Sequence, residues 1–215
     1  NLTINKNIIT NYTQTGIIFS GCANSTVNYN RVICLEGNGR RGIINDATNQ
    51  NAIVNYNFVR NTIGWDSGIY GIVAHNSQVI GDTIIYRCDY FYDGYAVYAN
   101  NSTIKENYIE ATSYNYSDPG SSSYSSSIKS NGSISSRSTI DSNIVVVNNY
   151  ANGIRASYAD ITNNTIKNYS NGWALITNGN CTINNNIIKD ISNGVYATSS
   201  PSNILTNNRI SVSNT

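Results

Sequence analysis

Charged and aromatic side chains gather most densely in one stretch of the chain, residues 85–98, which reads IYRCDYFYDGYAVY. Aromatic rings stack on the apolar faces of sugars, while Arg and carboxylate groups bind sugar hydroxyls or uronic carboxylates. Similar residue types occur one repeat earlier, at about the same distance after the repeated motif. We therefore predict a carbohydrate-binding face made of Trp65, Asp66, Arg87, Asp89, Tyr90, Tyr92 and Asp93.

Two classes of enzyme use such residues on a polysaccharide. A lyase holds calcium with Asp and Glu and uses Arg or Lys as its base. An inverting hydrolase uses two carboxylates about 6.5–9.5 Å apart. The stretch has no dense Asp and basic motif, and His75 has no Ser-x-Gly elbow or nearby Cys to complete a triad. We name no catalytic residue, expect no cofactor and no metal site, and keep an ordinary solvated face as the simpler interpretation.

A six-residue word that recurs nine times must position these side chains. It reads apolar, two polar residues, Asn, any residue, apolar, as in ITNNTI at 161–166. Successive copies begin 21 to 36 residues apart, a spacing typical of solenoid proteins. The other copies are INKNII at 4–9, VNYNRV at 27–32, VNYNFV at 54–59, IGDTII at 80–85, IKENYI at 104–109, IDSNIV at 140–145, INNNII at 183–188 and LTNNRI at 205–210.

The spacing inside the word predicts a bend. Its two apolar residues are five positions apart, so one straight strand cannot point both of them inward. A corner between two short strands can, and Asn suits a corner because it tolerates left-handed backbone and bonds to nearby backbone groups. Stacked coils would then form an internal amide ladder. The predicted ladder is Asn7, Asn30, Asn57, Asn107, Asn143, Asn164, Asn186 and Asn207, with Thr83 taking the corner of the word at 80–85.

A weaker word, Gly followed by an apolar residue, lies about 8–12 residues before the next corner and predicts a third strand. Poor helix formers dominate, and no sustained 3.6-residue apolar period appears. We predict an all-β parallel β-helix of about nine coils with three short strands per coil, forming one domain over 1–215. A Ser/Tyr-rich loop excursion at 110–132 accounts for the longest spacing. The Gly words are Gly16-Ile17, Gly42-Ile43, Gly71-Ile72, Gly94-Tyr95, Gly153-Ile154, Gly172-Trp173 and Gly194-Val195.

The NNTI and NNNII words on a coil of about 22 residues resemble the parallel β-helix repeats of the pectate-lyase-like superfamily. That group includes NosD-type periplasmic proteins, adhesin-like archaeal and bacterial surface proteins, and phage tailspikes. The resemblance covers nearly the whole chain and implies a right-handed helix. It implies little about function, because this scaffold carries enzymes, binders and structural proteins alike.

Composition bounds the partners and the compartment. The net charge is +1 and only 12% of residues are charged, which argues against nucleic acid and against a polybasic membrane surface. No apolar stretch is long enough to insert into a membrane. Low charge, 17 Tyr and no Met fit an extracellular, cell-surface protein. Asn115 and Asn131 are the best-placed glycosylation candidates, because both lie in the expected excursion.

The four cysteines do not have the spacing of a zinc site. Cys181 lies two residues before the apolar Ile183 and is expected in the core. Cys34 and Cys88 fall two coils apart, about 10 Å, beyond disulfide reach. Cys22 with Cys34 is the more plausible bridge.

Three functions remain open: a structural or adhesive surface rod, a carbohydrate-active lyase or hydrolase, and a trimeric receptor-binding spike. The rod is favoured because the repeat is regular while charges are few and diffuse. Both ends look uncapped, since Leu2 to Ile4 enters a corner word at once and Ile210 to Val212 still alternates like a strand. We expect copies of the chain itself as partners, meeting end to end or side to side, and surface glycans as a second class of partner.

Overall fold

The structure is a computed structural model that describes residues 1–35, 41–45, 51–62, 69–88, 94–113, 125–198 and 202–212. These residues form 26 β-strands and no helix. The strands fall into three parallel sheets, called sheets A, B and C, and the chain visits the three sheets in turn. The predicted all-β solenoid with three strands per coil is therefore confirmed.

Sheet A contains β1 (Thr3–Asn5), β4 (Thr26–Asn28), β7 (Ile53–Asn55), β10 (Gln78–Ile80), β13 (Thr103–Lys105), β16 (Ser138–Asp141), β19 (Ala159–Thr162), β22 (Thr182–Asn184) and β25 (Ile204–Thr206). Sheet B contains β2 (Ile8–Thr10), β5 (Arg31–Cys34), β8 (Phe58–Thr62), β11 (Thr83–Cys88), β14 (Tyr108–Ser113), β17 (Ile144–Asn149), β20 (Thr165–Ser170), β23 (Ile187–Ile191) and β26 (Arg209–Val212). Sheet C contains β3 (Thr15–Phe19), β6 (Arg41–Asn45), β9 (Tyr70–Ala74), β12 (Tyr95–Tyr98), β15 (Ser126–Asn131), β18 (Asn152–Ser157), β21 (Trp173–Asn178) and β24 (Asn193–Thr198).

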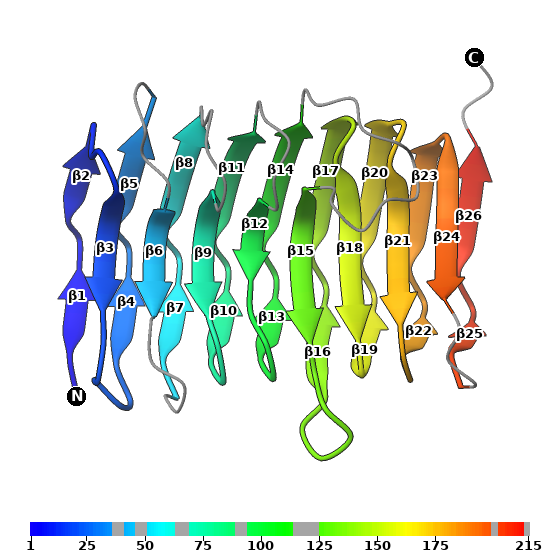
Figure 1. The fold of residues 1–215 in the computed structure, drawn as a ribbon, viewed down its shortest axis with the longest axis horizontal. Coiled ribbons are helices and arrows are strands. Elements are labelled where there is room, and N and C mark those ends of the chain that lie inside the picture. The colour runs from blue at the N-terminus through cyan, green and yellow to red at the C-terminus, as the bar shows by residue number, and fades with distance from the viewer. Residues whose placement is uncertain are drawn as a thin grey trace.

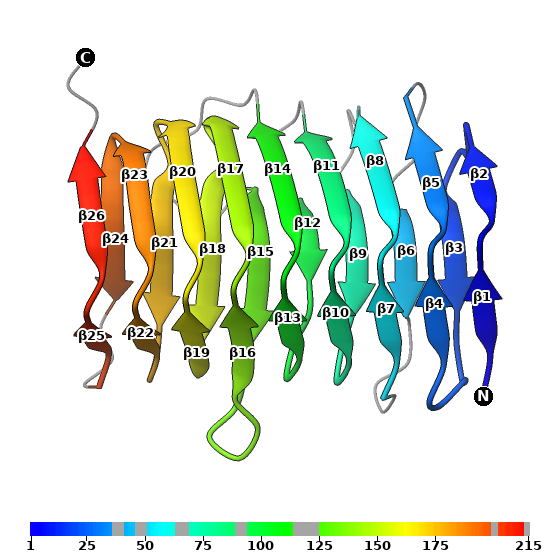
Figure 2. The same ribbon diagram turned by 180° about the vertical axis from the view of Figure 1, so that it is seen from behind.

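The coils wind into a right-handed rod (Figures 1 and 2). Sheets A and B follow one another along one side, and sheet C returns along the other. Sheets A and B hold nine described strands each and sheet C holds eight, so the ninth coil has two described strands. The N-terminus lies at one end of the rod and the C-terminus at the other (Figure 1).

The predicted corner between sheets A and B exists, but its left-handed backbone falls one residue earlier than expected. In every copy the third residue of the word, not the residue after it, has a positive φ. For the fourth copy this holds when the word is placed at 79–84, as the strand pairing requires. The side chain of this third residue therefore projects outward at the corner, whatever its type. These residues and their φ values are Lys6 57°, Tyr29 54°, Tyr56 54°, Gly81 68°, Glu106 59°, Ser142 55°, Asn163 56°, Asn185 57° and Asn207 55°.

The fourth residue of the word instead turns its side chain inward and builds the ladder. Asn164 is typical: its backbone N and its Nδ2 both donate to Asn186 Oδ1, at 2.9 and 3.0 Å. Its Nδ2 also donates to Ile140 O at 2.9 Å, one coil earlier. The complete ladder is Asn7, Asn30, Asn57, Asp82, Asn107, Asn143, Asn164, Asn186 and Asn208.

Two predicted corner positions were wrong. The fourth copy of the word runs 79–84, because Val79 pairs with Val54 and Ile104, so Asp82 rather than Thr83 joins the ladder. In the last copy the ladder residue is Asn208, while Asn207 is the outward, left-handed residue. The first error is a shift of the whole word by one residue, and the second assigned the third letter of LTNNRI to the ladder in place of the fourth.

The Gly word marks sheet C, as predicted, at a position where neighbouring backbones approach closely. A Cβ added to Gly153 would lie 2.2 Å from Ala174 O in the next coil, and one added to Gly71 would lie 2.5 Å from Ala96 O. The register aligns Gly71 with Ala96 and Gly153 with Ala174. The prediction that Gly94-Tyr95 and Gly172-Trp173 occupy this position was therefore wrong. Ala96-Val97 and Ala174-Leu175 occupy it in those coils.

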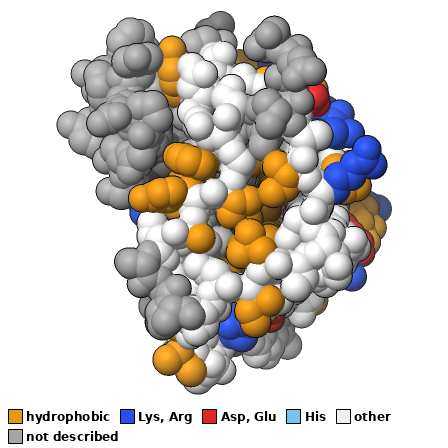
Figure 3. Space-filling model, turned by 90° about the vertical axis from the view of Figure 1, so that its right-hand side faces the viewer, with side chains coloured by type: hydrophobic (Ala, Val, Ile, Leu, Met, Phe, Trp, Pro, Cys, Tyr) orange, Lys and Arg blue, Asp and Glu red, His pale blue; other side chains and the backbone are white. Residues whose placement is uncertain are grey.

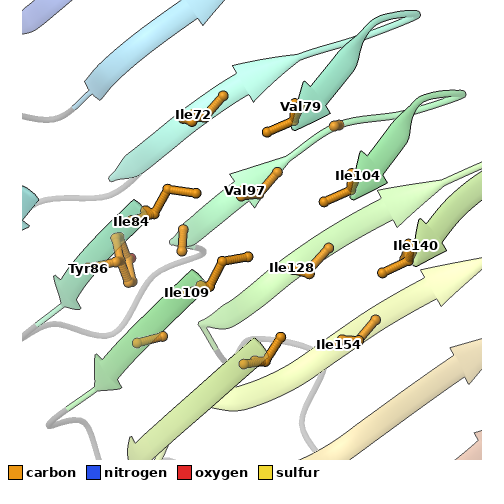
Figure 4. Packing of buried hydrophobic residues seen from close by; sticks show 14 of the residues in the cluster. Ile72, Val79, Ile84, Tyr86, Val97, Ile104, Ile109, Ile128, Ile140 and Ile154 are labelled. Atoms are coloured by element: carbon orange, nitrogen blue, oxygen red, sulfur yellow. The ribbon is translucent and has the colours of Figure 1, made fainter. Parts of the chain in front are cut away.

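The core is made of columns of apolar side chains, one from each sheet of each coil. In one coil Ile104, Ile109 and Ile128 come from β13, β14 and β15, and all three are fully buried (Figure 4). β-Branched residues fit such columns because their side chains pack well against identical neighbours on a pleated surface. Cys181 lies in the core, as predicted.

The predicted excursion at 110–132 is shorter than expected. Residues 110–113 belong to β14 and 126–131 to β15, and 114–124 lie outside the described residues. A separate loop, 132–137, protrudes between β15 and β16 (Figure 1). Its last residue, Arg137, anchors it to the rod: Nη2 donates to Asp160 Oδ1 at 2.6 Å, and Nη1 donates to Asn180 O at 2.9 Å. Hydrogen bonding to Arg137 lowers the pKa of Asp160.

The left-handed corner position gives a testable stability difference. Glu106→Gly should raise the free energy of unfolding by about 0.5–1 kcal/mol, because glycine adopts a φ of 59° without a Cβ penalty. Glu106→Val should lower it by about 1–2 kcal/mol, because β-branching makes that backbone harder to adopt. Urea denaturation of both variants checks the order, and equal stabilities would contradict the assignment.

Candidate binding surfaces

Most of the carbohydrate-binding face predicted from sequence lies outside the described residues. Trp65, Asp66, Asp89, Tyr90, Tyr92 and Asp93 are in this group, so their arrangement stays a prediction. Arg87 is described: it lies on β11, paired with Thr62 on β8 and Thr112 on β14. The structure thus places this Arg on sheet B without testing the face that it was assigned to.

A different aromatic surface appears at the corner between sheets A and B, which we call the corner tyrosine patch: Tyr29, Arg31, Tyr56 and Phe58. Tyr29 and Tyr56 occupy the left-handed corner position of consecutive coils, so their rings stack, with centroids 5.4 Å apart and planes at 16°. Both remain about half exposed, at 54% and 51%. The Arg31 guanidinium carbon lies 5.0 Å from the centre of the Phe58 ring.

The next coil leaves room for this patch. Gly81 follows Tyr56 in the column of corner residues, and a Cβ there would lie 2.7 Å from the Tyr56 ring. Glycine has two roles at this position: it adopts a φ of 68° without strain, and it leaves space for the Tyr56 ring. The result is a short, flat aromatic surface on a rigid part of the rod.

The signal for this patch was present in the sequence. The words VNYNRV and VNYNFV are consecutive and share Tyr as their third letter, followed two residues later by Arg31 or Phe58. The prediction missed it because the third letter was not known to be the outward corner position. Once that position is known, the two tyrosines must stack.

A second cluster of rings lies along sheet C and comprises Tyr70, Tyr95 and Tyr98 with Lys129. The three ring centroids are 5.5 to 6.0 Å apart. Lys129 Nζ donates to the Tyr95 hydroxyl at 2.8 Å and lies 4.5 Å from the centre of that ring. Tyr95 is almost fully buried, so this cluster contributes more to holding neighbouring coils together than to an open surface.

His75 packs edge-on against Tyr98, with centroids 4.8 Å apart. Its Nδ1 accepts a hydrogen bond from the Asn100 backbone N at 3.1 Å, and burial lowers the pKa of His75. A ring nitrogen that accepts a hydrogen bond belongs to the neutral imidazole. His75 therefore acts here as a structural acceptor between coils.

The described part of the chain contains no group of three or more His, Cys, Asp or Glu side chains that could hold a metal ion. Within the same residues, no helical segment has the length and apolarity needed to traverse a bilayer.

The structure does not join Cys22 to Cys34 by the predicted disulfide. Cys22 lies in the connection between β3 and β4, and its Sγ donates to Ser20 O at 3.3 Å. Cys34 ends β5 inside the rod, and its Sγ donates to Tyr12 O at 3.3 Å. The two residues lie at opposite ends of the coil cross-section, which explains the absence of a bridge.

Of the two predicted glycosylation sites, Asn115 lies outside the described residues. Asn131 ends β15 at a half-buried position, where its Oδ1 accepts from Ser157 Oγ at 3.0 Å. Its modification stays a prediction.

Sequence and fold together define the class of this protein, a parallel β-solenoid with an internal asparagine ladder. Comparison with protein-family models found no matching family. Comparison with curated proteins and with solved structures also found no match.

Proposed function

We propose that this chain is a non-enzymatic, extracellular β-helix rod of the pectate-lyase-like or NosD-type kind, and that copies of it associate end to end into a structural or adhesive surface assembly. The observation that carries this proposal is that the described coils repeat the same three-strand arrangement and core columns, so that one coil of this kind can stack on another. Low charge and the Asn, Ser and Thr richness of the repeat support an extracellular location.

The last described coil exposes side chains whose counterparts are buried in the second to eighth coils. Leu205 and Ile210 are 46% and 47% exposed, whereas Ile183 and Ile188, one coil earlier, are fully buried. Figure 3 looks onto this end of the rod and shows a cluster of hydrophobic side chains in its centre. Another coil stacked on this end would cover this apolar surface.

The two ends are complementary in hydrogen bonding as well. Each ladder residue donates from its backbone N to the Oδ1 of the next coil, as Asn186 does to Asn208 at 3.0 Å. At the last coil Asn208 has this donor to offer, and at the first coil Asn7 Oδ1 is the matching acceptor. Among the described contacts, neither group is used in this way. A second copy stacked head to tail would bring donor and acceptor together and cover Leu205 and Ile210.

The match is incomplete on one side. Sheets A and B present β25 and β26 at the last coil, but sheet C ends one strand earlier, at β24. A stacked copy would meet sheets A and B and leave a gap over sheet C. We therefore propose an offset contact between neighbouring copies in place of a seamless helix.

Sedimentation and electron microscopy over a range of concentrations test the assembly. The unmodified chain should form longer particles as concentration rises, and Ile210→Asp should stay monomeric because a carboxylate cannot be buried unpaired at the junction. Ile144→Asp is the matched control: Ile144 is 46% exposed on the side of the rod, and its replacement should leave assembly unchanged.

A monomer at every concentration would refute end-to-end assembly. So would equal dissociation of both variants, since that would show a general effect of added charge. A discrete trimer would also contradict the proposal and would favour a receptor-binding spike.

The corner tyrosine patch favours glycan binding as a second candidate function. Exposed rings offer flat apolar surface to a sugar, and Arg31 adds donors for a carboxylate or hydroxyl. On a glycan array, Tyr29→Ala and Tyr56→Ala should each weaken binding at least about tenfold, the loss of roughly 1.4 kcal/mol. Tyr169→Ala is the control, because Tyr169 is similarly exposed, at 57%, several coils away. Binding that none of the three changes would remove this function from the patch.

A further inference from the structure

One ladder position is occupied by a carboxyl group in place of an amide. Asp82 is almost fully buried between the ladder residues Asn57 and Asn107. Its Oδ1 accepts from the Asn57 backbone N at 2.6 Å and from Asn57 Nδ2 at 2.9 Å. Its own backbone N donates to Asn107 Oδ1 at 2.8 Å. Three of the ladder contacts are therefore intact at this position.

Each internal Asn of the ladder also donates twice from its Nδ2, once to the Oδ1 of the next ladder residue and once to a carbonyl oxygen one coil earlier, and an ionised carboxylate has no donor for either contact. From Asn30 to Asn208, the Nδ2 of each Asn in the ladder donates at 2.8 to 2.9 Å to the carbonyl oxygen of the inward apolar residue one coil earlier. At Asp82 the equivalent carbonyl is that of Val54, which pairs with Val79. The atom of Asp82 that takes the place of Nδ2 is Oδ2, which is buried and has no hydrogen-bond partner in the structure.

An ionised Asp82 would hold a buried negative charge against two oxygen acceptors, Val54 O and Asn107 Oδ1. A protonated carboxyl group in the same position has one O–H donor, and it restores one of the two contacts that an amide Nδ2 makes elsewhere in the ladder. We propose that Asp82 is a neutral carboxylic acid in the folded rod, with Oδ2 carrying the proton, and that it forms a pH-sensitive latch between neighbouring coils.

Within the described residues, the hydrogen-bond partners of Asp82 are Asn57 and Asn107, and neither side chain carries a charge. Burial raises the pKa of Asp82, and the two hydrogen bonds from Asn57 act in the opposite direction. The strands packed against β10 and β11 are β7, β8, β9, β12, β13 and β14. The titratable residues on all these strands and at their corners are Tyr56, Arg60, Tyr70, His75, Tyr86, Arg87, Cys88, Tyr95, Tyr98, Lys105, Glu106, Tyr108 and Glu110.

The direction of the pH effect follows from the two states of the chain. In the unfolded chain Asp82 has a pKa near 3.9, and in the folded rod its pKa is higher, so the folded state holds the proton more tightly. The stabilisation is fully present below about pH 4 and is lost as the pH rises through the folded-state pKa. Between the pKa of the unfolded chain and that of the folded rod, the folding equilibrium constant should fall about tenfold per pH unit.

Denaturant unfolding of the whole chain between about pH 4 and pH 8, with and without Asp82→Asn, tests the latch. In the Asp82→Asn variant the folding equilibrium constant should not show this tenfold fall per pH unit. The stability of the variant relative to the unmodified chain should therefore increase as the pH rises. Asn107→Asp, which places a second carboxyl group in the ladder, should add a further loss of the same slope. Identical pH profiles for all three proteins would overturn the proposal.

The protonation state can also be observed directly. The infrared difference spectrum between the unmodified chain and Asp82→Asn, taken on folded protein at neutral pH, should contain the carbonyl stretch of a protonated carboxylic acid. A carboxylate band in its place would show that Asp82 is ionised and would overturn the proposal even if the stabilities differ.

Discussion

Replacing Asn164 by Leu is expected to lower the free energy of unfolding by about 3–5 kcal/mol. The amide is fully buried and makes four side-chain hydrogen bonds, two accepted from Asn143 and two donated, to Ile140 O and Asn186 Oδ1. Leu fills the space but leaves the Asn143 backbone N and Ile140 O without these partners. The size of this loss reflects polar groups left without partners on both neighbouring coils.

Thermal and denaturant unfolding check this effect against a matched control. Asn163→Gly changes the adjacent residue, which is exposed and already left-handed, so the change should stay within about 1 kcal/mol. If Asn164→Leu unfolds at the same denaturant concentration as the unmodified chain, the ladder does not stabilise the rod.

Truncating the core column is the second large effect that we expect. Ile140→Ala should cost about 2–5 kcal/mol, because Ile140 is fully buried and a rigid stack of coils cannot collapse around the cavity. Ile144 belongs to the same copy of the word but lies on the outer face of sheet B, and Ile144→Ala should cost less than about 1 kcal/mol. Urea midpoints of the two variants give the comparison, and similar losses would show that the assigned burial is wrong.

The fold could be predicted because one short word records both the corner and the core. Ile161 and Ile166 face inward five residues apart, and Asn164 between them recurs in register, so a closed coil with a ladder follows from the sequence. The error at the fourth copy arose where two frames fit equally well. Ile80 and Ile85 are apolar like the true pair Val79 and Ile84, so the frame at 80–85 placed Thr83 in the ladder instead of Asp82.

Other errors have a steric explanation. The close approach in sheet C accepts Ala96 and Ala174 as well as glycine, so searching for Gly gave Gly94 and Gly172 in those coils. The pairing of Cys22 with Cys34 could not be judged from spacing, because it depends on which end of the coil each residue reaches. The corner tyrosine patch depends on the direction of the third letter, which becomes visible only when the left-handed position is assigned.

The identical position of the ladder residue in every coil has a consequence for how such a chain can change its length. Deleting residues 144–164 would join Asn143 to Thr165, remove one strand from each sheet and leave Asn143 one coil away from Asn186. The shortened chain keeps the same junction chemistry, because each coil contacts only its neighbours. Gain or loss of whole coils by gene duplication and deletion is therefore structurally nearly neutral, whereas loss of a single residue within the word shifts every inward side chain to the wrong face. The length of the rod is therefore set by its number of coils, which can vary while each coil keeps its arrangement of three strands.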